Sequence, residues 1–223
     1  YDTILRMIKD NPLVALELLK KNADKFSETK RRLVHSKIVG KLDSYGKEYI
    51  TRQALEAEYA KFDTASDFNG FTLLNIDKIE VMISYIAESV SNLFKVKLMK
   101  MLWYGDALSF KRRGIAMTGM VYRHEPMGAL PVGHYSLMDL ENLNIREEES
   151  NNYDLMLHIY PSIGMDYSIL TDEDRRILDD VIKKFKDFKA KDIIEYMHKE
   201  MAYTKTKAGE IIPFSLAKGI REF

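Results

Sequence analysis

The segment at residues 94–113 is apolar on nearly every side of the helix that its sequence predicts. Gly114 follows directly, and glycine commonly ends helices because it adopts the left-handed backbone conformation without strain. The apolar side chains of the segment include Leu98, Met99, Met101, Leu102, Trp103, Leu108 and Phe110. A helix that is apolar nearly all round is usually buried, so we expect this one to form the centre of the fold.

The composition is that of an ordinary globular protein. The chain has 223 residues, of which 46% are apolar and 30% charged, and its 34 basic residues equal its 34 acidic ones. A chain of this length forms one large domain or two small ones, and it buries enough surface for a core. The zero net charge contrasts with the clearly basic composition of most DNA-binding domains.

The residue types that are absent exclude several classes of protein. Without cysteine the chain has no disulfide framework, no thiolate zinc site and no thiol nucleophile, which fits a reducing compartment. We expect no membrane span, because no stretch of about 18 uncharged apolar residues is present. Charged residues among the first ten exclude a signal peptide, so we expect a cytoplasmic protein. Because the sequence begins with Tyr1, we expect it to be part of a longer protein.

Short helices are expected in the N-terminal part. Asn11 and Pro12 are typical of a helix N-cap and the first helical position, and Ser27 is a second candidate cap. Val34 and Ile38 lie one turn apart on one face of the helix that follows Ser27. The expected helices cover residues 2–9, 12–22, 28–42 and 49–59. Residues 61–75 are rich in Asp, Ser, Asn and Gly, which predicts a linker.

Two helices of the second part have capping signals in the sequence. Asp77 and Glu80 are expected to cap one helix as a pair, and Thr171 and Asp174 another. The buried stripe of the first consists of Ile79, Met82, Ile83, Ile86 and Val90. That of the second consists of Ile177, Leu178, Val181, Ile182 and Phe185. A further helix is expected at residues 190–199.

Short β elements complete the expected fold. They are a strand at residues 120–124, an antiparallel pair at 145–149 and 154–160 around Asn151-Asn152, and a terminal hairpin of 203–206 with 210–213. Pro131 is expected to open a short helix that runs to Met138. The predicted fold class is α+β, mainly α, a helical bundle with small antiparallel β elements.

No motif in the chain points to catalysis. It has neither a Gly-rich phosphate loop nor the G-x-S-x-G turn of a serine nucleophile. Its five histidines show no spacing that is typical of a metal site. We therefore expect no enzyme and assign no catalytic, cofactor-binding or metal-binding residue. A hydrolase built on His124 or His198 is the least favoured alternative.

The charge is uneven along the chain although its total is zero. Residues 95–123 hold seven basic residues and one acidic residue, and residues 139–154 hold one basic and six acidic residues. These blocks either form two solvated faces that neutralise each other within the fold or leave a basic surface for an acidic partner or nucleic acid. Aromatic residues also gather near the basic block. Together with arginine, aromatic side chains are the usual anchors of protein interfaces.

Several motifs, taken in order, resemble one protein family. The segment at residues 97–106, KLMKMLWYGD, is similar to the signature helix of the Panacea, or SocA-like, antitoxin domain. The resemblance spans about residues 75–220 and continues through Thr118-Gly119, Tyr122, residues 126–132 (PMGALPV), residues 170–173 (LTDE), residues 177–185, His198-Lys199-Glu200, Tyr203 and residues 209–212 (GEII). The chain departs from the family at Ala129, where proline is usual, at Tyr203, where tryptophan is usual, and at Met101 and Gly105, where a small aliphatic pair is usual.

This resemblance implies a binding function in a toxin–antitoxin system of bacteria or their phages. Domains of the family neutralise protein toxins by direct contact, and the SocA branch delivers its toxin to a protease. Blocking and delivery both stay open for this chain. We expect the partner surface on the basic helix and the segment after it, at Lys100, Tyr104, Arg112, Arg113, Tyr122, His124, Met127 and Tyr135.

The N-terminal part also resembles a known arrangement. Residues 1–42 are similar to the helices that follow a Cro/repressor-like helix-turn-helix in longer antitoxins of this kind. The resemblance implies an N-terminal helical segment at residues 1–60 after a missing DNA-binding module, a linker at 61–75 and the Panacea-like domain at 76–223. DNA would then be bound only through the missing module. The N-terminal helices either form a homodimer interface or pack on the Panacea-like part, and the alternative function is a nucleic-acid-binding regulator.

Overall fold

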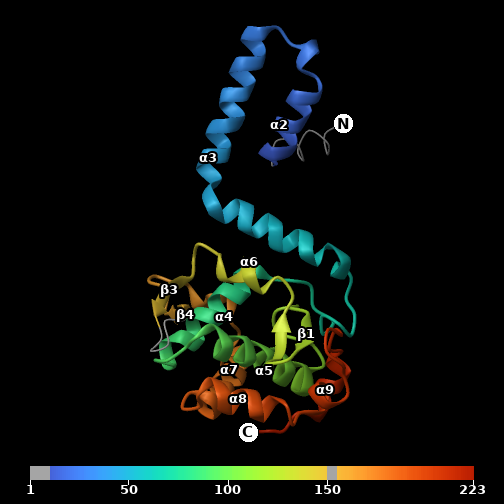
Figure 1. Cartoon of the computed structure of the whole chain (residues 1–223), viewed down its shortest axis with the longest axis vertical. Coiled ribbons are helices and arrows are strands. Elements are labelled where there is room, and N and C mark those ends of the chain that lie inside the picture. Colours follow the sequence, from blue (N-terminus) through green and yellow to red (C-terminus); the bar gives the residue numbers. More distant parts are fainter. Residues whose placement is uncertain (1–10, 150–154) are drawn as a thin grey trace. The chain divides into compact units, whose positions relative to one another are not determined.

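The computed structural model describes residues 11–149 and 155–223 of the chain (Figure 1). These residues are mainly helical, with two small antiparallel sheets of two strands each, so the predicted fold class is confirmed. The chain divides into two compact units, unit 1 at residues 1–50 and unit 2 at residues 51–223. The helix expected at residues 2–9 and the turn expected at Asn151-Asn152 lie outside the described residues.

Unit 1 consists of α2 (Pro12–Lys21), a 3₁₀ turn (Ala23–Lys25) and the first part of α3 (Glu28–Tyr59). The Asn11 side chain accepts a hydrogen bond from the backbone N–H of Val14 at 3.2 Å, which confirms the predicted cap of α2. Ser27 caps α3 in the same way, through the N–H of Lys30.

The helices predicted at residues 28–42 and 49–59 are one helix. α3 runs without interruption for 32 residues, so the predicted break was wrong. The residues between the two predicted helices include Gly46 but no proline. A glycine costs a helix only about 1 kcal/mol, whereas proline would end it. Residues 51–59 belong to unit 2, where Leu55 and Tyr59 are buried.

Unit 2 is built around α5 (Lys95–Arg113), as its sequence predicts. Every residue of α5 from Lys97 to Phe110 is buried, and Gly114 ends the helix with a φ of 78°. α5 contacts α4 (Ile76–Ser89), α7 (Asp172–Phe185), α8 (Ala190–Met197) and the 3₁₀ helix η4 (Phe214–Gly219). The predicted apolar stripes of α4 and α7 are both buried.

The two helix caps that the sequence predicts in unit 2 have different outcomes. Thr171 and Asp174 form the predicted capping box of α7. The predicted cap of α4 was wrong, because Asn75 caps this helix through the N–H of Lys78 at 2.9 Å. Asp77 lies in the first turn of α4. Arg52 forms ion pairs with both Asp77 and Glu80, so these acidic residues join α3 to α4.

The first sheet is a hairpin of β1 (Tyr122–Glu125) and β2 (Gly128–Pro131), in which Tyr122 pairs with Pro131 and Glu125 with Gly128. The sequence predicts β1 but places Pro131 at the start of a helix, which was wrong. Pro131 ends β2, where its missing N–H is tolerated. The short helix α6 (His134–Met138) begins three residues later, after Gly133.

The second sheet and the C-terminal segment complete unit 2. β3 (Asn144–Glu149) pairs with β4 (Leu155–Tyr160), which confirms the predicted antiparallel pair. The predicted terminal hairpin was wrong, because residues 201–204 form the helical turn α9 (Met201–Thr204). Ile211 forms a bridge with Arg123 of β1 instead. The backbone N–H of His124 donates to Glu210 O at 2.8 Å, so this segment lies along the outer edge of β1.

Two further observations concern the expected organisation. Residues 61–75 lie in unit 2, where the buried Asn69 side chain bonds to the carbonyl oxygens of Phe62 and Thr64. The domain boundaries expected at residues 60 and 76 stay a prediction. Within the described part of the chain, every helix is too short or too polar to span a bilayer.

Candidate partner-binding site

The structure divides the eight candidate partner residues by exposure. Lys100, Tyr104, Tyr122 and His124 are buried, each at 8% exposed or less. Arg112 is exposed and Arg113 is half-buried. Met127 and Tyr135 are 54% and 74% exposed. The eight candidates therefore do not form one continuous surface. The contacts of each residue show whether it can bind a partner.

Tyr104 and Tyr122 serve the core of unit 2. The hydroxyl of Tyr122 donates to Asp106 Oδ2 at 2.7 Å, and Thr118 donates to the same carboxylate. Burial raises the pKa of Asp106, against the opposing effect of the hydrogen bonds that it accepts. Tyr104 donates to Glu200 Oε1 at 3.3 Å. Several residues of the family-like motifs thus hold the fold together from the inside.

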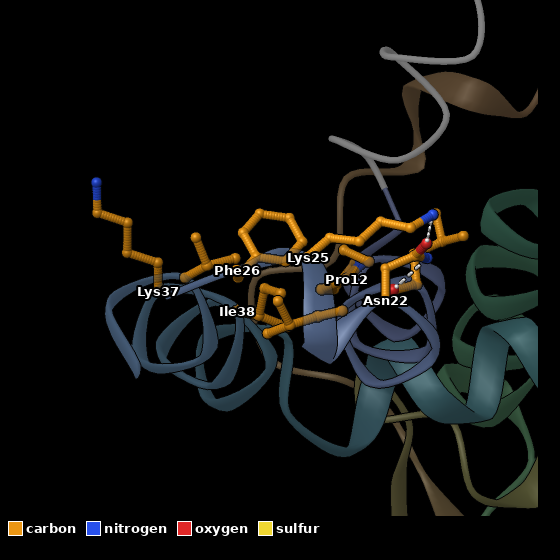
Figure 2. Close-up of a pocket in the computed structure, with 10 residues that line it drawn as sticks. Pro12, Asn22, Lys25, Phe26, Lys37 and Ile38 are labelled. Atoms are coloured by element: carbon orange, nitrogen blue, oxygen red, sulfur yellow. Dashed lines mark hydrogen bonds between the residues drawn. The ribbon is translucent and has the colours of Figure 1, made fainter. Parts of the chain in front are cut away.

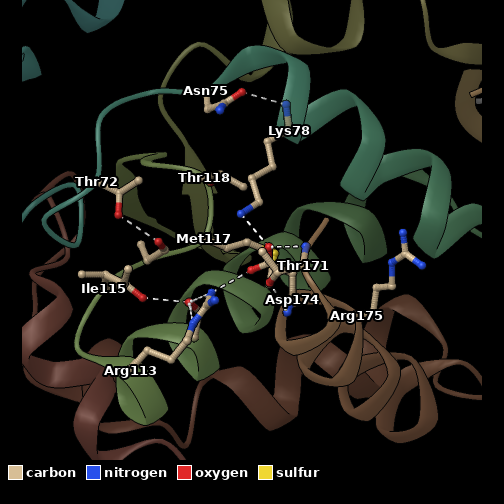
Figure 3. A network of polar contacts seen from close by, with 12 residues as sticks. Thr72, Asn75, Lys78, Arg113, Ile115, Met117, Thr118, Thr171, Asp174 and Arg175 are labelled. Atoms are coloured by element: carbon tan, nitrogen blue, oxygen red, sulfur yellow. Dashed lines mark hydrogen bonds and ion pairs between the residues drawn. The ribbon is translucent and has the colours of Figure 1, made fainter. Parts of the chain in front are cut away.

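Arg112 and Arg113 are neutralised within the fold. Arg112 pairs with Asp180 at 2.7 Å and with Glu222 at 3.1 Å. Arg113 pairs at 2.8 Å with Asp174, to which Lys78 also points (Figure 3).

The Asp174 carboxylate is fully buried. Its burial opposes ionisation, but hydrogen bonds from Lys78 and Thr171 outweigh that effect and lower its pKa. This end of the basic block is therefore neutralised within the fold, but not by the acidic block that the sequence suggested. The acidic residues come from α7 and the C-terminal segment, not from residues 139–154.

His124 lies beside two aromatic rings but not in a catalytic arrangement. The ring of Tyr203 stacks on His124 at 3.8 Å and on His198 at 4.3 Å between centroids. Burial lowers the pKa of His124, and the charge of His198 acts in the same direction. His124 Nδ1 lies 2.9 Å from the hydroxyl of Thr206, but that hydroxyl donates its proton to Ala202 O. The imidazole must then donate to Thr206, so it does not act as the base that a threonine nucleophile needs.

Three of the predicted residues, Lys100, Met127 and Tyr135, meet at one pocket. It lies between the N-terminal part of α5, the tip of the β1–β2 hairpin and α6, and has a volume of about 540 Å³. Its lining is formed by Lys95, Val96, Met99, Lys100, Glu125, Pro126, Met127, Leu130, His134 and Tyr135. We call it the hairpin pocket.

Gly128 lets the hairpin approach α5 and α8 close to this pocket. Its φ is 102°, and a Cβ atom there would lie 2.6 Å from Met197 Sδ and 3.1 Å from Lys100 Cε. The next residue binds both neighbours, because Ala129 N donates to Met197 Sδ at 3.0 Å and Lys100 Nζ donates to Ala129 O at 2.9 Å. A side chain at position 128 would separate these contacts.

The charges at the hairpin pocket are mainly positive. Burial lowers the pKa of Lys100 to about 8, against the attraction of Glu125. Lys95 Nζ lies 4.5 Å from the centre of the Tyr135 ring, and burial lowers its pKa too. The pKa of His134 is lowered by burial and then by Lys95, which favours its neutral form. Two ammonium groups therefore share the lining with one carboxylate, Glu125, and a second carboxylate outside the lining, Asp139, attracts Lys95.

Sequence reasoning missed Lys95 and His134 as members of the site. Lys95 lies in the basic block, so a signal for it was present. The pocket exists only because residues 122–131 fold into a hairpin, and the sequence predicts a helix from Pro131 in place of the second strand. Without the hairpin, the sequence could not show that Tyr135 lies next to Lys95 of α5.

Unit 1 has a pocket of its own, about 650 Å³ in volume. Pro12, Phe26 and Ile38 are among its apolar lining residues (Figure 2). Its polar side chains are engaged in part, since Asn22 bonds to Leu18 O and to Lys25 Nζ. Within the described residues no group of three or more histidine or acidic side chains is placed to hold a metal in either unit.

Part of the chain matches a known protein family. Residues 98–203 match a family model described as the antitoxin SocA-like, Panacea domain. The matched region begins in α5 and ends in α9, and it includes both sheets, α6, α7 and α8. Neither the curated proteins nor the solved structures contain a match to the chain.

Proposed function

Because residues 98–203 form a SocA-like Panacea antitoxin domain, we propose that this chain is an antitoxin that neutralises a protein toxin by binding it directly. The family match carries this proposal, since it gives the antitoxin role and implies a toxin as partner. Direct binding needs a surface that is preformed and partly apolar. The hairpin pocket, with its exposed Met127 and Tyr135, supports such a surface.

The exposed aromatic side chain is the strongest feature of this surface. Tyr135 is 74% exposed although it is a large ring, and its face is in contact with the Lys95 ammonium. Tyrosine is enriched among the few residues that carry most of the binding energy of protein interfaces. A standard interface buries about 1,600 Å² in total, so the hairpin pocket would be the centre of a wider contact.

We propose no catalytic role for the domain, and we propose that it acts in the cytoplasm. Families of antitoxins like this one are typically non-enzymatic. The hydrogen-bond direction at Thr206 argues against a nucleophile beside His124. Blocking of the toxin and its delivery to a protease stay open as mechanisms, because both begin with binding.

Nucleic-acid binding through unit 1 is the second candidate function. The observation in its favour is a cluster of basic residues on α2 and α3, where Lys20, Arg31 and Arg32 line one pocket and Arg32 also pairs with Glu28. Such a cluster predicts a gel shift with duplex DNA that weakens steeply as the salt concentration rises. Arg31→Glu should abolish that shift if unit 1 binds DNA. If the gel shift is unchanged by this substitution, or if the unchanged chain gives no gel shift, DNA binding through unit 1 is excluded.

Growth rescue tests the proposed function. The reading frame next to the gene for this chain would be expressed alone and together with the chain. We expect toxicity from the neighbour alone, rescue by the chain and a complex of the two purified proteins. If the neighbour is toxic, and the chain is present at equal or higher level without rescuing growth or binding it, the proposal is wrong.

A further inference from the structure

Two lysines at the hairpin pocket differ from the arginines at the other end of α5. Arg112 and Arg113 each pair with a carboxylate. In the described ranges neither Lys95 nor Lys100 forms an ion pair, and the single hydrogen bond of Lys100 goes to a backbone carbonyl. Lys100 is 2% exposed. Glu125 attracts this ammonium without forming a direct ion pair with it. A buried ammonium without a direct ion pair is costly, so its position at a pocket points to a use outside the fold.

The walls of the same pocket are apolar. Val96 and Met99 come from α5, Pro126 and Met127 from the hairpin tip, and Leu130 from β2. A volume of about 540 Å³ lies in the range of pockets that hold ligands or large side chains. Apolar walls exclude a fully hydrated ion, and the two ammonium groups exclude a cation.

We propose that the hairpin pocket binds an apolar side chain of the toxin together with an adjacent carboxylate. This carboxylate forms an ion pair with Lys95 and is also attracted by the positive charge of Lys100. This inference rests on the proposed function and adds the chemistry of the partner. The carboxylate is either an Asp or Glu side chain or the C-terminal carboxylate of the toxin, because all of them offer the same charge. Glu125 attracts Lys100 and Asp139 attracts Lys95, but in the described part of the chain neither carboxylate forms a direct ion pair with its lysine, so each ammonium group can bind a further carboxylate.

Tyr135 lines the pocket next to Lys95. Its ring lies over the Lys95 ammonium and leaves most of its own surface exposed. An apolar side chain that enters the pocket can therefore contact the ring edge while its carboxylate reaches the ammonium. Loss of the ring or of the ammonium should weaken binding separately.

A pair of small probes tests this chemistry without the toxin. N-acetyl-phenylalanine carries an aromatic side chain next to a carboxylate, and N-acetyl-phenylalaninamide is its neutral counterpart. Each would be titrated into the 223-residue chain while the ¹³C-methyl NMR signals of its methionines are followed. We expect the acid to shift the Met99 and Met127 signals with a millimolar dissociation constant, as befits so small a ligand. The amide should bind about fivefold more weakly, the effect of one partly exposed ion pair.

Single substitutions show which residues bind the probes. Lys95→Ala should remove the preference for the acid, and Tyr135→Ala should weaken both probes. Lys183→Ala, which removes an exposed lysine of α7, should change neither titration. Equal binding of acid and amide to the unchanged chain, or shifts confined to methionines outside the pocket, would overturn the proposal. The absence of any shift for both probes would do the same.

The toxin provides the second arm and separates this inference from the proposed function. If the chain rescues growth and binds the toxin, Lys95→Ala should reduce the affinity about fivefold and Tyr135→Ala at least about tenfold. Unchanged affinity in both variants would refute the pocket chemistry while the antitoxin role stands. Failure of the unchanged chain to bind the toxin would refute the proposed function, whatever the small probes show.

Discussion

Replacing Lys100 with methionine tests whether the fold keeps a buried charge at a cost to its own stability. Lys100 is 2% exposed, and its burial lowers its pKa from 10.5 to about 8. A difference of that size means that the charged ammonium lowers the free energy of unfolding by about 3 kcal/mol at neutral pH. Methionine keeps the length of the side chain and removes the charge.

The substitution also has a cost. It removes the hydrogen bond from Lys100 Nζ to Ala129 O, which measures 2.9 Å, and leaves that carbonyl without this donor. The loss of one buried hydrogen bond costs about 1–2 kcal/mol. The gain from removing the charge exceeds this loss, so we expect Lys100→Met to raise the free energy of unfolding at pH 7 by about 1–2 kcal/mol.

The pH dependence gives an independent check with a defined sign. The pKa of Lys100 is lower in the folded chain than in the unfolded chain, so the unfolded chain binds more protons between about pH 8 and 10.5. The free energy of unfolding of the wild type should therefore rise with pH in this range. Burial also lowers the pKa of Lys95 and of Lys97, so only the difference between wild type and variant reports Lys100.

Urea unfolding followed by circular dichroism at pH 7, 8, 9 and 10 measures both quantities. We expect the advantage of Lys100→Met to shrink by about 2 kcal/mol between pH 8 and 10. Lys183→Met, at an exposed site on α7, is the control and should run parallel to the wild type. A variant that is less stable by about 2 kcal/mol or more at pH 7, with the pH slope of the wild type, would refute the reasoning.

Four further predictions follow from the described contacts. Asp106→Ala should lower the free energy of unfolding by about 4 kcal/mol, because it strands the buried donors of Met117, Thr118 and Tyr122; a loss below about 1 kcal/mol in urea unfolding would contradict the role of this carboxylate. Gly128→Ala should cost about 2 kcal/mol and lower the melting temperature, because a Cβ atom would lie 2.6 Å from Met197 Sδ. Since the pKa of His124 is lowered in the folded chain, wild-type stability should fall as the pH drops below its usual value of 6.5, and His124→Asn should flatten that fall in unfolding curves measured from pH 7 to 5. The exposed leucines of unit 1, among them Leu18 at 38% exposed, predict a homodimer in sedimentation velocity that Leu18→Glu dissociates, whereas a monomeric wild type would exclude it.

The sequence was sufficient for elements whose signals are local. The apolar pattern of residues 94–113 and the following Gly114 predicted α5, and Thr171 with Asp174 predicted the start of α7, because helix caps and buried stripes depend on residues within two turns of each other. The cap of α4 was missed although its signal is also local. Asn75 is a preferred N-cap residue, and because α4 begins at Ile76, Asp77 lies inside the first turn and cannot cap it.

The candidate site was only partly accessible to sequence reasoning. Met127 and Tyr135 were candidates because they lie in the segment after the basic helix, and both are exposed. Tyr104 and Tyr122 are aromatic residues of the same region, but both lie in the core. The sequence of this region does not show which aromatic rings reach the surface. The hairpin that forms the pocket depends on Gly128 packing against α5 and α8, a contact between distant parts of the chain.

The affinity of the purified toxin for this chain, measured by isothermal titration calorimetry, tests the central claim most directly. Wild type, Met127→Ala, Tyr135→Ala and the control Lys183→Ala would be compared after their folding is checked by circular dichroism. We predict tight binding by the wild type and the control, and at least tenfold weaker binding by Tyr135→Ala, the effect of about 1.4 kcal/mol or more at an interface anchor. Equal affinity for all four proteins would contradict the claim that the hairpin pocket is the centre of the toxin interface.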